Sequence, residues 1–144
     1  MKNYIYLLLT SLVLFAAGSL TAQNGVLEIY NFNGDLIPDG THLYKLSGDE
    51  AGKNLIATDT LFFKNTTDDL VYVKIRKIED LVIEGSTNYF CGLGQCYPPF
   101  LFLTPHSYPL EAGATIDIVG SFVGDYNPGD GVGTSTVTYS FLSV

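Results

Sequence analysis

The chain has little positive charge, few sulfur-containing residues and no tryptophan. Its 144 residues include 7 lysines and arginines against 15 aspartates and glutamates, with 2 cysteines, 2 histidines and 1 methionine. A formal net charge of −8 argues against nucleic-acid binding, which needs a basic surface. Two cysteines exclude a dense disulfide scaffold. With 47% hydrophobic and 15% charged residues, the chain is also too apolar to be disordered, which leaves one globular domain of ordinary size.

An apolar run fills the N-terminus. Lys2 supplies a short positive start, the stretch 5–20 is almost uninterrupted apolar sequence, and small residues follow up to Ala22. This order is typical of a cleaved secretory signal peptide. The run is shorter than the ~20 apolar residues that a transmembrane span needs. We therefore expect a signal peptide over residues 1–22 and a secreted or cell-surface domain over 23–144, with no membrane span in the mature chain.

The rest of the chain repeats its apolar residues with a period of two, as β-strands do. In the clearest predicted strand, 70–78, Val71, Val73 and Ile75 share one face. We predict further strands at 26–30, 59–64, 115–122 and 134–141, and a short helix near 49–54. Turn sequences rich in Gly, Asn and Asp separate these runs. The pattern predicts an all-β antiparallel β-sandwich.

Three basic residues lie close together in the strand predicted at 70–78. Strict alternation places Lys74 and Arg76 on its polar face and Lys77 on the opposite one. We interpret the group as a solvated face that also discourages pairing at a sheet edge.

Cys91 and Cys96 are separated by four residues, two of which are glycine. An exported chain meets oxidising conditions, and the glycines let the loop fold back so that the two sulfurs can meet. We therefore favour a structural disulfide that pins a loop between two strands. A redox-active pair is a weaker alternative, because Pro98 and Pro99 forbid the helix that usually follows such a motif. A metal site is weaker still, since no spacing links the two histidines to the cysteines.

The acidic segment from Gly124 to Gly131 carries a calcium hypothesis. Asp125, Asn127 and Asp130 are hard oxygen donors close together in the sequence, as calcium prefers. Their spacing misses the helical-loop calcium motif, and a turn between two strands explains the same residues. We expect no resident metal or cofactor.

Catalytic motifs are missing from the sequence, which has no nucleophile elbow, no zinc-binding helix motif and no phosphate-binding glycine loop. We expect a protein that is not an enzyme. A small hydrolase that uses carboxylates such as Asp125, Asp130 or Glu111 is the weakest of our alternatives.

Aromatic residues gather near predicted strand ends and loops, where exposed rings could stack on sugars or on a protein partner. They are Tyr30, Phe32, Tyr89, Tyr97, Phe100, Phe102, Tyr108 and Tyr126. Among them we select Tyr89, Tyr97, Phe100 and Tyr126 as candidate ligand-stacking residues, although packing in the core is the commoner fate of aromatic rings. A carbohydrate-binding module is thus our second function hypothesis.

Several segments from Thr66 to Phe141, in this order, resemble an immunoglobulin-like module of exported proteins from Bacteroidetes-type bacteria. The segments are 65–68 (NTTD), 71–77 (VYVKIRK), 88–91 (NYFC), 96–99 (CYPP), 110–114 (LEAGA), 122–128 (FVGDYNP) and 133–141 (GTSTVTYSF). In that group such modules often precede a sorting domain of the type IX secretion system.

The resemblance implies an immunoglobulin-like sandwich, a structural disulfide between Cys91 and Cys96, and no known catalytic residue. It also implies a candidate O-glycosylation site at Thr60, within Asp59-Thr60-Leu61. Comparable modules continue into a further strand, so the sandwich could be one strand short and its open edge could pair with a partner strand. Our first function hypothesis is a secreted or cell-surface non-catalytic module with a structural or binding role, whose partner is a protein or a glycan.

Overall fold

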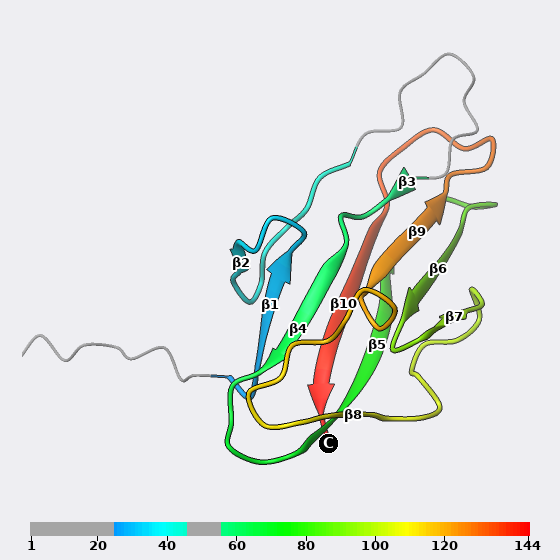
Figure 1. Ribbon diagram of the computed structural model, residues 1–144. Coiled ribbons are helices and arrows are strands. Elements are labelled where there is room, and N and C mark those ends of the chain that lie inside the picture. Colours follow the sequence, from blue (N-terminus) through cyan, green and yellow to red (C-terminus); the bar gives the residue numbers. More distant parts are fainter. Residues whose placement is uncertain (1–24, 46–55) are drawn as a thin grey trace, which may run out of the picture.

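The computed structural model describes residues 25–45 and 56–144, and every regular element within them is a β-strand. Figure 1 shows the longer strands running side by side along the length of the molecule. The predicted signal peptide at 1–22 and the predicted short helix near 49–54 lie outside the described residues. In the part of the chain that is described, no helix is long and apolar enough to cross a membrane.

The described residues form ten strands. They are β1 (Leu27–Asn31), β2 (Leu36–Ile37), β3 (Ile56–Ala57), β4 (Leu61–Asn65), β5 (Val71–Leu81), β6 (Thr87–Gly92), β7 (Gln95–Tyr97), β8 (Tyr108–Leu110), β9 (Val123–Asn127) and β10 (Thr136–Ser143). The strands predicted at 26–30, 59–64, 70–78 and 134–141 correspond to β1, β4, β5 and β10. The period of two was therefore a sound guide to these four strands.

The strands pair antiparallel and build two layers. One layer holds β10, β5 and β8, in that order. The other joins the sheet β2-β1-β4 to the sheet β3-β9-β6-β7, which meet where Leu61 of β4 bridges Phe122 just before β9. Rings meet between the layers, since the centroids of Phe63 and Phe141 are 4.7 Å apart, as are those of Phe122 and Tyr139. The predicted all-β antiparallel sandwich is confirmed.

The core lies between the two layers and takes alternate residues from each strand. Val73 and Ile75 of β5 are fully buried, whereas Tyr72 and Arg76 between and beside them are exposed. The buried apolar residues are Leu61, Phe63, Val73, Ile75, Phe90, Leu93, Tyr97, Leu110, Ile116 and Phe122.

Lys77 does not belong to a solvated face. Lys74 and Arg76 lie on the outer face of β5, but Lys77 follows the buried alternation and is only 1% exposed. Its ammonium group donates hydrogen bonds to the backbone carbonyls of Asn88 and Pro99, which replace the water that it loses. The alternation of β5 correctly predicted that Lys77 lies on the face opposite Lys74 and Arg76. The interpretation of all three basic residues as a solvated face was wrong for Lys77.

Residues 115–122 do not form the predicted strand. Only the two ends, Thr115 and Phe122, make bridges to β4. Between them the Asp117 carboxylate accepts the backbone N–H of Gly120 and closes a turn, which leaves Ile118 59% exposed. An aspartate that bonds its own backbone competes with strand pairing, and here this local bond outweighs the apolar alternation.

The segment interpreted as a loop from Gly124 to Gly131 begins inside a strand. β9 pairs with β6 on one side and with β3 on the other. The turn starts only after Asn127, whose side-chain oxygen accepts the N–H of Gly129. Asp125 is therefore a strand residue.

The disulfide between Cys91 and Cys96 joins β6 to β7. The two residues are direct partners across this hairpin, with Cα atoms 3.9 Å apart. Leu93 and Gly94 form the loop, and both have positive φ angles, 55° and 85°, as a two-residue type I′ turn requires. Leu93 also buries its side chain in the core and donates its N–H to the carbonyl of Gly120. The predicted disulfide that pins a loop between two strands is confirmed.

Phe122 is 1% exposed and contacts the rings of Phe90, Tyr139 and Phe141. We expect F122A to lower the free energy of unfolding by about 3–5 kcal/mol, because the truncation leaves a cavity between the layers. Urea denaturation followed by circular dichroism measures this change. The control V132A, at a fully exposed side chain, should change it by less than about 0.5 kcal/mol. Similar small losses in both variants would contradict the packing role of Phe122.

Candidate ligand-binding site

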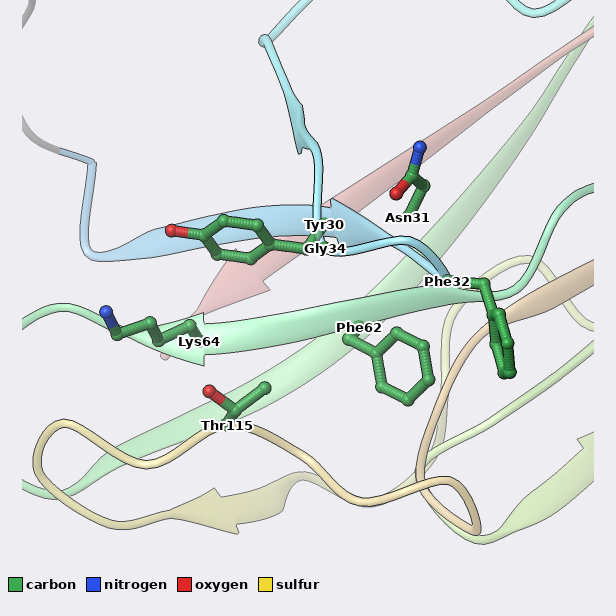
Figure 2. A pocket seen from close by; sticks show the side chains of 7 residues that line it. All are labelled: Tyr30, Asn31, Phe32, Gly34, Phe62, Lys64 and Thr115. Carbon is green, nitrogen blue, oxygen red and sulfur yellow. The ribbon is translucent and has the colours of Figure 1, made fainter.

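Three aromatic side chains lie together on β1, on the turn after it and on β4, and we call them the aromatic surface: Tyr30 and Phe62, which are half-buried, and Phe32, which is exposed. Tyr30 and Phe62 are direct partners in the register of the two strands, so their side chains lie on the same face of the sheet. Phe32 follows the end of β1 and is 72% exposed, and its ring centroid lies 6.3 Å from that of Phe62. Figure 2 shows the rings of Phe32 and Phe62 side by side, with Tyr30 on the neighbouring strand.

A tight turn between β1 and β2 presents Phe32 to solvent. The carbonyl of Asn31 accepts the N–H of Gly34, whose φ of 84° favours glycine at this position. The side-chain oxygen of Asn31 accepts the backbone N–H groups of Asn33 and Asp35, each at 2.9 Å, and its amide nitrogen donates to the Asp35 carboxylate at 3.0 Å. These bonds hold the loop before any ligand arrives, so Phe32 is preorganised.

Hydrogen-bonding groups surround the aromatic surface. A depression of about 400 Å³ is lined by the three rings together with Asn31, Gly34, Lys64 and Thr115. An adjoining depression of about 430 Å³ is lined by Asn31, Phe32, Asn33, Thr58, Asp59 and Thr60. Because Asn31 and Phe32 line both, the exposed ring of Phe32 stands between a mainly apolar hollow and a mainly polar one.

The charges around the aromatic surface are mixed in sign. The Tyr30 hydroxyl donates a 2.6 Å hydrogen bond to the Glu28 carboxylate. This bond, with smaller contributions from burial and from the charge of Glu28, raises the pKa of the Tyr30 phenol. Beside the second depression, Lys45 forms a 2.7 Å ion pair with Asp59. The site therefore offers hydrogen-bond donors and acceptors without a strong field of one sign.

The four aromatic residues selected from the sequence for stacking have different surroundings. Tyr97 is 5% exposed and packs on Phe90 with ring centroids 4.9 Å apart, so its ring is in the core. Tyr126 is half-buried and its hydroxyl hydrogen-bonds Ser135. Tyr89 is half-buried in β6, and Phe100 is 78% exposed in the loop after β7. None of the four lines the depressions beside the aromatic surface.

The candidate calcium ligands are only partly brought together. Asp125 is buried in β9, Asn127 caps its own turn, and Asp130 is exposed after that turn. Over residues 25–45 and 56–144, no group of three or more His, Cys, Asp or Glu side chains could hold a metal ion. Glu111, the third residue of the hydrolase alternative, lies in the turn after β8.

Thr60, the candidate O-glycosylation site, is half-buried in the segment between β3 and β4. It lines the second depression beside Asp59. A glycan on Thr60 would therefore stand next to Phe32, and its presence stays a prediction.

Sequence reasoning missed Phe62 and Lys64 as site residues. The signal was present, because alternation over 61–65 sends Phe62 and Lys64 to the face opposite buried Leu61 and Phe63. Tyr30 and Phe32 were among the aromatic residues expected near strand ends, but only the pairing of β1 with β4 brings them next to Phe62.

No family model, no curated protein and no solved structure matches this chain.

Asp125 is 9% exposed, and burial raises the pKa of its carboxyl group above the ordinary 3.8. The folded protein thus holds the proton more tightly than the unfolded chain does. Burying the ionised carboxylate costs stability at neutral pH, and this cost disappears as the pH falls through the raised pKa. We expect D125N to have a larger free energy of unfolding than the wild type at about pH 7, and the difference to shrink towards about pH 4.

Chemical denaturation over a pH series measures this difference. The control D68N, at an aspartate outside the core, should show no comparable dependence on pH. An advantage of D125N that grows on acidification would contradict the expected sign.

Proposed function

We propose that this protein is an exported, non-catalytic immunoglobulin-like β-sandwich that binds carbohydrate through the aromatic surface. The observation that carries the proposal is the 72% exposed ring of Phe32, held by a hydrogen-bonded turn beside Phe62 and between a mainly apolar and a mainly polar depression. Exposure of an aromatic ring to water is unfavourable, and covering the ring with an apolar face of a ligand lowers the free energy.

The chemistry of the site suits a sugar. A pyranose ring has apolar C–H faces that can stack on Phe32 and Phe62, and hydroxyl groups around its rim. The aromatic surface is surrounded by amide, hydroxyl, carboxylate and ammonium groups. They belong to Asn31, Asn33, Asp59, Lys64 and Thr115. The Asn31 side chain already holds the turn, and Asp59 is paired with Lys45. Asn33, Lys64 and Thr115 can donate to and accept from sugar hydroxyls, which fixes the orientation of a stacked ligand.

A protein partner fits the same site less well. A stable protein interface buries about 800 Å² on each side around an apolar core. Here three rings lie among charged and amide side chains, and the hollows beside them are shallow, one of them mainly apolar and the other mainly polar. We therefore favour a sugar as ligand and expect a protein to bind this face weakly.

The export route belongs to the same proposal. The residue order that resembles immunoglobulin-like modules of exported Bacteroidetes-type proteins, the apolar N-terminal run and the disulfide all fit a protein that works outside the cytoplasm. In that setting the module would hold a glycan at or near the cell surface without chemical change to it.

We expect the purified protein to bind at least one polysaccharide in a panel of xylan, mannan, mixed-linkage glucan, pectin and chitin. F32A should weaken this binding about tenfold, the effect of about 1.4 kcal/mol of lost stacking. Affinity gel electrophoresis and isothermal titration calorimetry measure the change.

The matched control is F100A, which removes an equally exposed phenylalanine that lies outside the aromatic surface. It should bind as the wild type does. Loss of binding in F100A but not in F32A would move the site to the loop after β7. No binding to any member of the panel would overturn the carbohydrate function.

A further inference from the structure

Lys77 is the one fully buried cation among the described residues, and its surroundings are unusual for a lysine. Its side chain is 0% exposed, its ammonium group lies 4.9 Å from the ring centroid of Phe102, and it donates to the carbonyls of Asn88 and Pro99. A lysine is almost never buried to this degree unless it has a charged partner or a functional role. A lysine held out of water is also one of the nucleophiles that proteins use.

Two polar side chains complete the surroundings of Lys77. The Glu79 carboxylate oxygen Oε1 lies 3.2 Å from Lys77 Nζ. The same oxygen accepts a 2.8 Å hydrogen bond from the side-chain amide nitrogen of Asn88. One carboxylate oxygen therefore contacts both the amine of Lys77 and the amide of Asn88, and a carboxylate in this position can move protons between them.

Asn88 itself has an unexplained polar atom. The residue is 3% exposed, and its side-chain oxygen Oδ1 is buried without a hydrogen-bond partner. A buried carbonyl oxygen without a partner costs about 1–3 kcal/mol, so such atoms are rare. The hydrogen bond from Nδ2 to Glu79 is the contact that holds the Asn88 side-chain amide in the core.

We propose that Lys77 and Asn88 form an intramolecular amide cross-link, with Glu79 as the catalytic acid and base. Lys77 Nζ attacks Cγ of Asn88, the Cγ–Nδ2 bond breaks, and ammonia leaves. The product is a secondary amide between the two side chains. Ile75 and Phe90, two residues from Lys77 and Asn88 on the same strands, are fully buried, so we expect little water to compete for Cγ.

The protons and charges of this step balance without any further reactant. Glu79 first accepts a proton from the Lys77 ammonium group, which leaves a neutral amine with its electron pair free to attack. The protonated Glu79 then donates to Nδ2, to which it is already hydrogen-bonded, and Nδ2 departs as ammonia. After the attack, Nζ loses a second proton to Glu79. Glu79 passes this proton to the released ammonia, which leaves as ammonium. The carboxylate is thereby restored and no electrons are exchanged with an outside oxidant.

The cross-link would connect the two layers of the sandwich. Lys77 lies in β5 of one layer and Asn88 in β6 of the other, and no backbone hydrogen bonds pair these two strands. A covalent bond there would resist separation of the layers, whereas the disulfide ties only neighbouring strands of one layer. A module that holds a glycan under mechanical load would gain from such a bond, but the chemistry does not depend on the proposed function.

The test uses the full chain and a protease that cleaves after glutamate. Cleavage after Glu50, Glu79, Glu84 and Glu111 places Lys77 in the peptide 51–79 and Asn88 in the peptide 85–111. We expect mass spectrometry of the reduced digest to find these two peptides joined, with a mass lower than their sum by one ammonia. Tandem spectra should place the bond between Lys77 and Asn88.

Separate peptides of unmodified mass would overturn the proposal. Ammonia loss from the 85–111 peptide alone would also overturn it, because this outcome indicates a cyclic imide at the asparagine and no link.

Variants assign the roles. E79Q keeps the size of the side chain but cannot accept a proton, and it also removes the cleavage site at residue 79, so that Lys77 lies in the peptide 51–84. We expect this peptide and 85–111 to be found separate, in a protein whose circular dichroism is that of a folded sandwich. K77M should likewise lack the link, and the matched control K74M, on the outer face of the same strand, should keep it. A full yield of linked peptide in E79Q would overturn the role of Glu79.

Discussion

The two layers of this sandwich depend on aromatic rings that meet between them. Phe63, Phe90 and Phe122 project from one layer and Tyr139 and Phe141 from the other, with ring centroids 4.7–6.1 Å apart. Glycines make room where the rings are largest. A Cβ at Gly124 would lie 3.0 Å from the ring of Tyr139, and one at Gly92 would lie 2.7 Å from Ile75. The close approach of the layers thus requires small residues in β6 and β9 opposite large ones.

The same packing decides which groups are left for binding. In β1 and β4 the inward positions, such as Leu27, Ile29 and Phe63, contribute to the core, so the outward positions carry Tyr30, Phe62 and Lys64. Phe32 is outside this alternation because it sits in a turn closed by Asn31. Within the core, burial with the charges of Asp125 and Glu79 raises the pKa of the Tyr139 phenol, which keeps it neutral among the rings.

Four of the ten described strands, including the two longest, followed from alternation, whereas no predicted range covered β2, β3, β6, β7, β8 or β9. The strands β1, β4, β5 and β10 were predictable because each carries a run of period two with β-branched or aromatic residues. The stretch 115–122 has the same pattern but turns, because Asp117 bonds its own backbone. β9 escaped prediction because glycine, aspartate and asparagine are typical of turns, and only pairing with β6 and β3 holds them extended. Of the binding site, Tyr30 and Phe32 were expected near strand ends, whereas Phe62 and Lys64 were not.

The sequence by itself determined that the chain is all-β, that its cysteines bond within one hairpin, and that the inner face of β5 includes position 77. These are local properties, because period, turn type and loop length each depend on a few neighbouring residues. The tertiary structure alone decided which rings stay exposed beside one another and which polar groups meet in the core. The aromatic surface joins residues of β1 and β4, and the Lys77–Glu79–Asn88 cluster joins two layers. Such neighbours are set by long-range strand pairing and packing, which no local pattern encodes.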